Sequence, residues 1–262
     1  MVVIDSLSSI SDLKKDIKKD NLRVISNFLL PASDQVNAIK EENLFFLKSG
    51  NTNFIFYKSP RSYRLFYFSL SFSSLEEDLK NLSLSFSDPV ILEEITRNEV
   101  SPIQIKPSLV LTRLHRDLPS DFKPSYTAVP IKADISDAKK IEEILCNNFD
   151  PVCERVPDIS ELSVLIDNGD VAVVKSDNNI KGLLISNMDN QQLHLRYWWV
   201  SPEKRGNGIG SSLINYYFQK AFDINAKGLF LWVDVNNVNA INRYSHFGFL
   251  NNNRFDFIYR IQ

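Results

Sequence analysis

The sequence predicts an α/β protein with a mixed central sheet flanked by helices, built as two similar halves. The apolar periods of residues 126–262 follow the order β-α-α-β-β-β-α-β-α-β-β. The first half repeats most of this order at a nearly constant offset. Five of the eleven prolines lie in residues 102–130, which is typical of an extended connection because proline disfavours helix. We therefore expect two domains, residues 1–125 and 126–262.

Local signals assign the elements of the second half. Asp134 is the expected N-cap of its first helix, and Gly169 ends its second helix. The turn-rich segments SDNN and NMDN separate three consecutive strands. Helices are expected over 134–149, 158–167, 208–222 and 238–247, and strands over 126–131, 171–175, 180–187, 192–200 and 229–234, with a terminal hairpin over 249–261.

A short repeated segment supports the duplication. The residues ISDLKK at 10–15 recur as ISDAKK at 135–140, which is 125 residues later. Strands are expected over 2–4, 44–48, 54–58 and 64–72, and helices over 11–19, 31–42 and 75–82. Beyond residue 82 the halves diverge, since 96–100 is too short to match the last helix of the second half. The alternative is that the first half is an unrelated α+β domain that shares only the three consecutive antiparallel strands with the second half.

Composition excludes several classes of protein. The 30 basic and 32 acidic residues give a net charge of −2, which argues against a broad nucleic-acid surface. No apolar run exceeds five residues (229–233), far below the ~18 needed to span a bilayer. The N-terminal segment contains Asp5 and no long apolar stretch, unlike a secretory signal. Two cysteines and three scattered histidines predict neither a disulfide framework nor a zinc site. We expect a cytoplasmic protein without a metal, a nucleic acid or a membrane partner.

The most informative stretch is VSPEKRGNGIG at residues 200–210, between an apolar strand and an amphipathic helix. Glycines at 206, 208 and 210 allow a ligand to approach the backbone N–H groups closely. These groups lie at a helix start, which favours an anion such as a pyrophosphate, and Arg205 adds charge. A P-loop would need Gly-Lys-Ser/Thr, and a dinucleotide fingerprint would need its third glycine one place later. On its own, the loop fits a purely structural turn equally well.

A second series follows the strand at 229–234: Asn237, Ala240, Tyr244, Gly248 and Phe249. Together with the glycine loop, this series resembles the GCN5-related N-acetyltransferase (GNAT) superfamily. The resemblance covers the second half well and the first half only as a degenerate copy, so it implies two tandem GNAT-like domains. It also implies that acetyl-coenzyme A is the co-substrate. It implies that the strand ending at Val200 splays from its neighbour and pairs with the pantetheine arm, and that Asn237 contacts the cofactor. The pyrophosphate would bind Arg205, Gly206, Asn207, Gly208, Ile209, Gly210 and Ser211.

The resemblance also implies catalytic roles. Tyr244 would protonate the leaving thiolate. The alternative is that Tyr244 is a core residue of an amphipathic helix. His194 would be the base that deprotonates the amine; its alternative is an exposed strand residue without a role. Strand alternation places His194, Arg196, Trp198 and Val200 on one face, with Trp198 as an acceptor wall. The alternative bases are Asp150 and Glu154, which could instead bind the ammonium of the substrate.

The first half departs from this pattern where a cofactor would bind. After the strand expected over 64–72 the chain reads Ser73-Ser74-Leu75, without glycine or a preceding arginine. We therefore expect residues 1–125 not to bind coenzyme A, but to pack against the second half and shape the acceptor cleft. The expected activity is direct transfer of an acetyl group to a small-molecule primary amine in a ternary complex. The alternative is an acyl-coenzyme A-binding sensor without turnover. The pattern selects neither the acceptor nor an oligomeric state.

Overall fold

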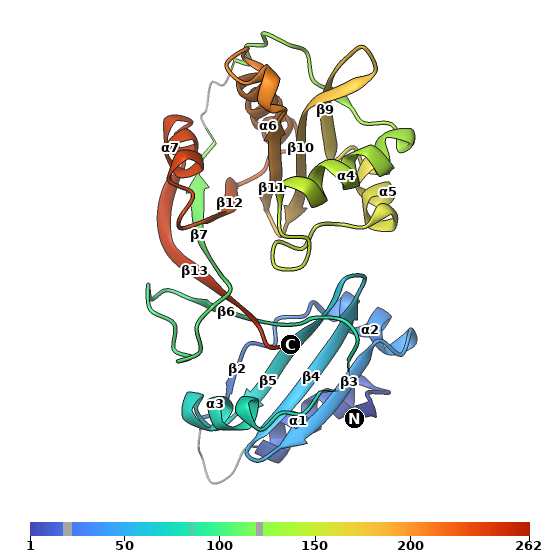
Figure 1. The fold of residues 1–262 in the computed structure, drawn as a ribbon, viewed down its shortest axis with the longest axis vertical. Coiled ribbons are helices and arrows are strands. Elements are labelled where there is room, and N and C mark those ends of the chain that lie inside the picture. Colours follow the sequence, from blue (N-terminus) through green and yellow to red (C-terminus); the bar gives the residue numbers. More distant parts are fainter. Residues whose placement is uncertain (18–22, 85, 119–122) are drawn as a thin grey trace. The chain divides into compact units, whose positions relative to one another are not determined.

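A computed structural model describes residues 1–17, 23–84, 86–118 and 123–262. The chain divides into two compact units (Figure 1). The first unit contains Met1–Leu111 and also the chain end, Arg254–Gln262. The second unit contains Thr112–Asn253. The division therefore falls earlier than the expected boundary at residue 125, and the last residues return to the first unit.

The first unit is a mixed sheet in the order β1-β3-β4-β5-β6, continued by the end of β13. Only β5 and β6 run parallel among these paired strands, and the short strand β2 pairs with β5. Residues 18 and 19 of the helix expected over 11–19 lie outside the described residues. The elements are β1 (Val2–Val3), α1 (Leu7–Ile17), β2 (Ile25–Ser26), α2 (Ala32–Lys40), β3 (Leu44–Ser49), β4 (Thr52–Ser59), β5 (Ser62–Ser69), α3 (Phe72–Lys80), β6 (Val90–Thr96) and β7 (Leu109–Arg116), whose last five residues belong to the second unit.

The second unit repeats this plan in the order β12-β11-β10-β9-β8, with β7 beside β12. The parallel pair of β11 with β12 corresponds to β5 with β6. Asp134 forms a capping box before α4, and Asp158 caps α5, as the sequence predicted. The elements are β8 (Ile131–Lys132), the 3-10 turn η1 (Ile135–Asp137), α4 (Ala138–Asn148), α5 (Ile159–Asp167), β9 (Val171–Ser176), β10 (Asn179–Asp189), β11 (Gln192–Val200), η2 (Pro202–Lys204), α6 (Ile209–Asp223), β12 (Gly228–Asp234), α7 (Val238–His246) and β13 (Leu250–Arg260).

The fold class predicted from the sequence is confirmed, including the repeated order of elements. Two expected strands are wrong. The strand over 126–131 is reduced to β8 at Ile131–Lys132, because Pro130 has no N–H to donate to a neighbouring strand. In place of the expected terminal hairpin there is one long strand, β13 (Leu250–Arg260). Its residues Phe255–Arg260 pair with β6, so they do not fold back on the preceding part of the strand.

Helix α6 lies close against the sheet of the second unit at a glycine. A Cβ atom on Gly182 of β10 would lie 2.5 Å from Cγ2 of Ile209 and 2.9 Å from Cδ1 of Leu213. The α6 residues Leu213, Ile214, Tyr217 and Phe218 form the centre of a buried apolar cluster with β11 and β12. This packing fixes the start of α6 beside the end of β11, where the glycine loop lies.

Candidate functional site

The glycine loop presents a helix start without a cap. Gly206 and Gly208 have φ of +83° and +77°, a region that L side chains rarely adopt. Gly208 is the N-cap of α6 and provides no side-chain hydrogen bond, whereas α5 and α7 are capped by Asp158 and Asn237. The first N–H groups of α6 are therefore available to an external acceptor.

The residues around this helix start hold the loop in place. Arg205 donates from Nε to the carbonyl of Val200 at 3.3 Å and is exposed, as are Asn207 and Ser211. Ile209 is buried in the core, so only its backbone can face a ligand. Ser212 accepts the N–H groups of residues 127 and 128, which ties that segment to α6. The expected loop residues thus converge on one helix end, with a guanidinium beside it.

Strands β11 and β12 separate beside this helix start. Their parallel pairs run from Gln192 with Gly228 to Leu195 with Leu231. β11 continues to Val200 and stays paired with β10 there. Among the described strands, β10 and β12 are the only neighbours of β11, so its edge beyond Leu195 has no strand partner. An exposed strand edge of this kind can pair with an extended, amide-containing ligand.

A bulge in β11 overturns the expected common face of His194, Arg196, Trp198 and Val200. Ile185 pairs with Tyr197 and Ser186 pairs with Leu195, which leaves Arg196 as the extra residue. The bulge shifts the alternation by one position. Trp198 and Val200 therefore pack with the α6 cluster, while Tyr197 and Trp199 pack with the cluster of α4 and α5.

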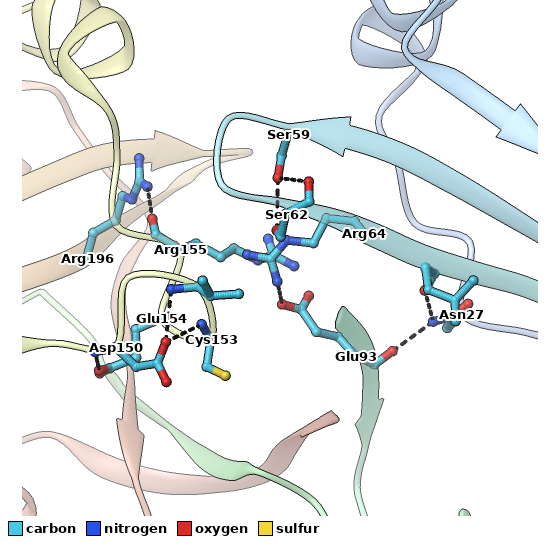
Figure 2. Close-up of polar contacts among 12 residues, drawn as sticks. Asn27, Ser59, Ser62, Arg64, Glu93, Asp150, Cys153, Glu154, Arg155 and Arg196 are labelled. Carbon is cyan, nitrogen blue, oxygen red and sulfur yellow. Dashed lines mark hydrogen bonds and ion pairs between the residues drawn. The ribbon is translucent and has the colours of Figure 1, made fainter. Parts of the chain in front are cut away.

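His194 and Arg196 lie on the opposite face from Trp198. Arg196 donates to Glu161 of α5 at 2.6 Å. It also donates to the carbonyl of Arg155 at 3.3 Å (Figure 2). The His194 ring stacks on Phe230 with centroids 4.4 Å apart and an interplanar angle of 7°. Burial lowers the pKa of His194 to about 3, and three nearby arginines add to the shift. The imidazole is therefore neutral at physiological pH but very weakly basic.

Tyr244 of α7 lies against Trp198 at the other side of the sheet. Their ring centroids are 5.5 Å apart, and Arg243 lies 5.8 Å from the Trp198 ring. The indole Nε1 of Trp198 is buried without a hydrogen-bond partner among the described residues. A Cβ on Gly210 would lie 3.1 Å from Trp198, so the ring reaches the first turn of α6. Burial raises the pKa of Tyr244, which keeps the phenol protonated across the neutral range.

The two acids of the loop before α5, Asp150 and Glu154, both accept N–H groups of the loop itself. Asp150 accepts the N–H groups of residues 152 and 153 at 2.9 Å (Figure 2). Glu154 accepts the N–H of Asp150 through Oε2 at 2.8 Å, and the hydroxyl of Tyr197 lies 2.7 Å from the Glu154 carbonyl. Burial is the largest cause of the raised pKa of Glu154, and its carboxylate interacts electrostatically with Asp234 and Tyr244.

Asn237 has a structural role that the sequence motif did not reveal. Its side-chain oxygen accepts the N–H of Ala240 at 3.1 Å and thereby caps α7. The motif residue thus orients the helix that carries Tyr244. Sequence reasoning did not single out Asp234, the last residue of β12, whose carboxylate accepts the N–H of Asn236 at 2.9 Å and adds to the rise in the pKa of Glu154. An acid that closes an apolar strand beside the motif was the available signal.

Comparison with known families decides the class of this unit. The model described as "Acetyltransferase (GNAT) family" matches residues 138–249. Residues 138–249 form a GNAT domain. Acetyl-coenzyme A is the co-substrate of this family, as the glycine loop and the Asn–Tyr series predicted.

The likeness in fold extends beyond the matched residues of the GNAT domain. A protein from Novosphingobium aromaticivorans assigned to the GNAT family is 16% identical, with a TM-score of 0.54 over 88% of this chain and 96% of that chain. A GCN5-related N-acetyltransferase from Sphaerobacter thermophilus is 13% identical, with a TM-score of 0.54 over 80% and 77%. At these identities the likeness shows the fold alone. No curated protein matches the chain.

Two further findings concern the whole described chain. Among residues 1–17, 23–84, 86–118 and 123–262, none of the helices has the length and apolar character needed to cross a bilayer. The same residues contain no group of three or more histidines, cysteines or acids arranged to hold a metal ion. Neither Cys146 nor Cys153 takes part in a disulfide bond.

Proposed function

We propose that the second unit transfers an acetyl group from acetyl-coenzyme A to a primary amine by direct attack in a ternary complex. The observation that carries this proposal is the juxtaposition at the end of β11. An uncapped helix start, an unpaired strand edge and a protonated phenol meet there around Trp198. Each feature suits one part of the co-substrate: the pyrophosphate, the amides of pantetheine and the sulfur.

The loop residues fit the co-substrate on three independent grounds. The N–H groups of Ile209, Gly210 and Ser211 would bind phosphate oxygens at the positive end of α6. The positive φ at Gly206 and Gly208 keeps bulky side chains out of the approach. Arg205 and Lys204 add positive charge beside the loop. Acetyl-coenzyme A would supply the activated thioester; the remaining chemistry belongs to the side chains of the unit.

Tyr244 would donate its phenolic proton to the leaving sulfur. A free thiol has a pKa near 8.5. The coenzyme A thiolate therefore leaves more readily when a phenol donates a proton to it. The raised pKa of Tyr244 keeps that proton available over the neutral range. A backbone N–H on the edge of β11 near Val200 would stabilise the oxyanion. No covalent enzyme intermediate is needed, because the amine can attack the thioester carbonyl directly.

Glu154 suits the role of base better than His194. A base with a pKa of about 3 cannot hold the proton of an alkylammonium, and the His194 ring is engaged with Phe230. Glu154 is more basic than an ordinary carboxylate because burial raises its pKa. It interacts with Tyr244, and the Asp150 N–H and Tyr197 hydroxyl position its loop. Glu154 would accept the amine proton directly or through one water.

Glu154→Gln should lower kcat by about 10²-fold or more, because a general base contributes roughly 10²–10⁴-fold. The wild-type rate should fall as the pH drops through the raised pKa of Glu154, since only the carboxylate accepts a proton. In Glu154→Gln this fall of the rate at low pH, the acidic limb of the pH–rate profile, should move to higher pH, where the amine is deprotonated by solvent. Steady-state release of coenzyme A, measured from pH 5 to 9 with an amine panel, checks this.

His194→Gln is the matched control for the base. It should retain most of the wild-type kcat and the same acidic limb. Loss of activity in His194→Gln together with full activity in Glu154→Gln would restore the histidine as the base. Calorimetric binding of coenzyme A to both variants separates a lost base from a lost fold.

The acceptor would be a cationic amine. The carboxylates of Asp150 and Asp234 both interact electrostatically with Glu154, and the negative charge of these three groups would attract an ammonium group. The alternative function, a sensor that binds acyl-coenzyme A without turnover, predicts saturable binding and no amine-dependent release of coenzyme A. The positioned Tyr244 and Glu154 favour the enzyme, because binding alone uses neither.

A further inference from the structure

Strand β5 of the first unit also has an edge that its parallel neighbour, β6, covers only in part. β5 pairs with β4 along its whole length, from Ser62 to Ser69. On its other edge it pairs with β6 only from Tyr63 to Leu65, although β6 continues to Thr96. The first unit therefore contains the same separation of parallel strands as β11 and β12 in the second unit.

In the first unit this edge is occupied by the chain itself. β2 pairs antiparallel with the end of β5, Ile25 with Ser69 and Ser26 with Phe68. Since β4 takes the opposite edge, β2 must lie on the edge that β6 has left. Figure 1 shows β2 beside β5. The described strands of the second unit have no counterpart of β2 on the β11 edge.

The side chain of Asn27 closes the gap between the separating strands. Its Nδ2 donates to the carbonyl of Glu93 at 2.8 Å and to that of Leu65 at 3.3 Å (Figure 2). Its Oδ1 accepts the N–H of Tyr67 at 2.9 Å. The side chain is 8% exposed, so these are buried contacts. A carboxamide that bridges two strands in this way takes the place of a backbone amide.

Further contacts hold the segment and the strands beneath it. The Phe28 ring packs on Phe66 and Phe68, with centroids 5.2 Å and 5.7 Å away. The hydroxyl of Tyr67, whose N–H Asn27 accepts, donates to the carboxyl of Glu94 at 2.7 Å. Both groups of this pair are buried.

The N-terminus of α3, the helix that follows β5, is capped by a side chain of the chain itself. α3 begins only three residues after Ser69, without a glycine loop. Ser71 caps it, accepting the N–H of Ser74 at 3.1 Å. Both parts of an amide-and-phosphate site, the open strand edge and the uncapped helix start, are thus filled from within the chain.

We propose that residues 25–28 are a built-in ligand that fills the cofactor-type groove of the first unit, so that one chain binds a single acyl-coenzyme A. The nature of the ligand in the second unit rests on the proposed function. The segment supplies the edge hydrogen bonds and the amide bridge that an extended amide ligand would otherwise make.

Amide hydrogen exchange of the full chain tests this, with coenzyme A as the probe. Asn27→Ala should speed exchange of the Tyr67 amide by about tenfold or more, because that N–H loses its buried acceptor. It should also lower Tm by roughly 5 °C. Asn98→Ala, an exposed asparagine of the same unit, is the control and should change neither quantity. Coenzyme A should slow exchange in residues 198–212 of the wild type and leave 65–69 unchanged.

Asn27→Asp keeps the shape of the side chain in case Asn27→Ala does not fold. The carboxylate retains the acceptor for Tyr67 but loses both donors, so Tm should fall while the Tyr67 amide stays protected. Unchanged Tyr67 exchange in a folded Asn27→Ala, or protection of residues 65–69 by coenzyme A, would overturn the proposal. Protection by coenzyme A in neither unit would instead overturn the proposed function, and the Asn27→Ala exchange rate still decides whether the segment fills the groove.

Discussion

Gly208→Glu combined with Gly210→Glu should weaken binding of acetyl-coenzyme A by about 100-fold or more, because two carboxylates would face the pyrophosphate at the start of α6. Gly208 has a φ of +77°, and a Cβ there would lie 2.7 Å from Oγ1 of Thr127. The loop must therefore rearrange to accept any side chain at this position. Isothermal titration calorimetry of both proteins measures the effect; the wild type should bind one equivalent.

The strain at Gly208 calls for a milder variant. Gly210→Glu alone adds one carboxylate in the first turn of α6, where an acid favours the helix itself. Ser160→Glu is the matched control, because it adds a carboxylate to the exposed first turn of α5 in the same unit. The control should bind normally. Equal affinity in Gly210→Glu, Ser160→Glu and the wild type would remove the glycine loop from the site.

Tyr244→Phe should lower kcat by about 10²-fold or more while the KM for acetyl-coenzyme A changes little, since it removes only a proton donor. The ring contact with Trp198 would remain, so the fold of α7 should be preserved. Because burial raises the pKa of Tyr244, the wild-type rate should not fall on the alkaline side until well above the ordinary tyrosine range. Amine-dependent release of coenzyme A as a function of pH measures both effects.

Tyr216→Phe is the control for this substitution. Tyr216 lies on α6 of the same unit and is partly buried, but no catalytic role is proposed for it. It should keep the wild-type kcat and pH profile. A kcat equal to wild type in Tyr244→Phe would exclude the phenol as the acid, and the pantetheine thiolate would then leave without a donor.

Sequence-local signals predicted most of the fold. Asp134, Asp158 and Gly169 mark helix ends through hydrogen bonds or backbone conformations that involve only near neighbours in the chain. Such interactions are encoded within a few residues and can be recognised without tertiary information. The short strand β2 and the single long strand β13 were not recognised, because their partners lie far away in the sequence.

The candidate site likewise has features that local sequence motifs predicted and features that depend on tertiary structure. The glycine loop and the Asn–Tyr series are contiguous motifs, and the sequence by itself determined the helix start, the phenol and the GNAT family of residues 138–249. Only the tertiary structure decided which face each β11 residue occupies. The bulge at Arg196 shifts the alternation, so that His194 stacks on Phe230 on one face while Trp198 lies beside Tyr244 on the other. Register depends on how β10 pairs with β11, and neither strand alone carries that information.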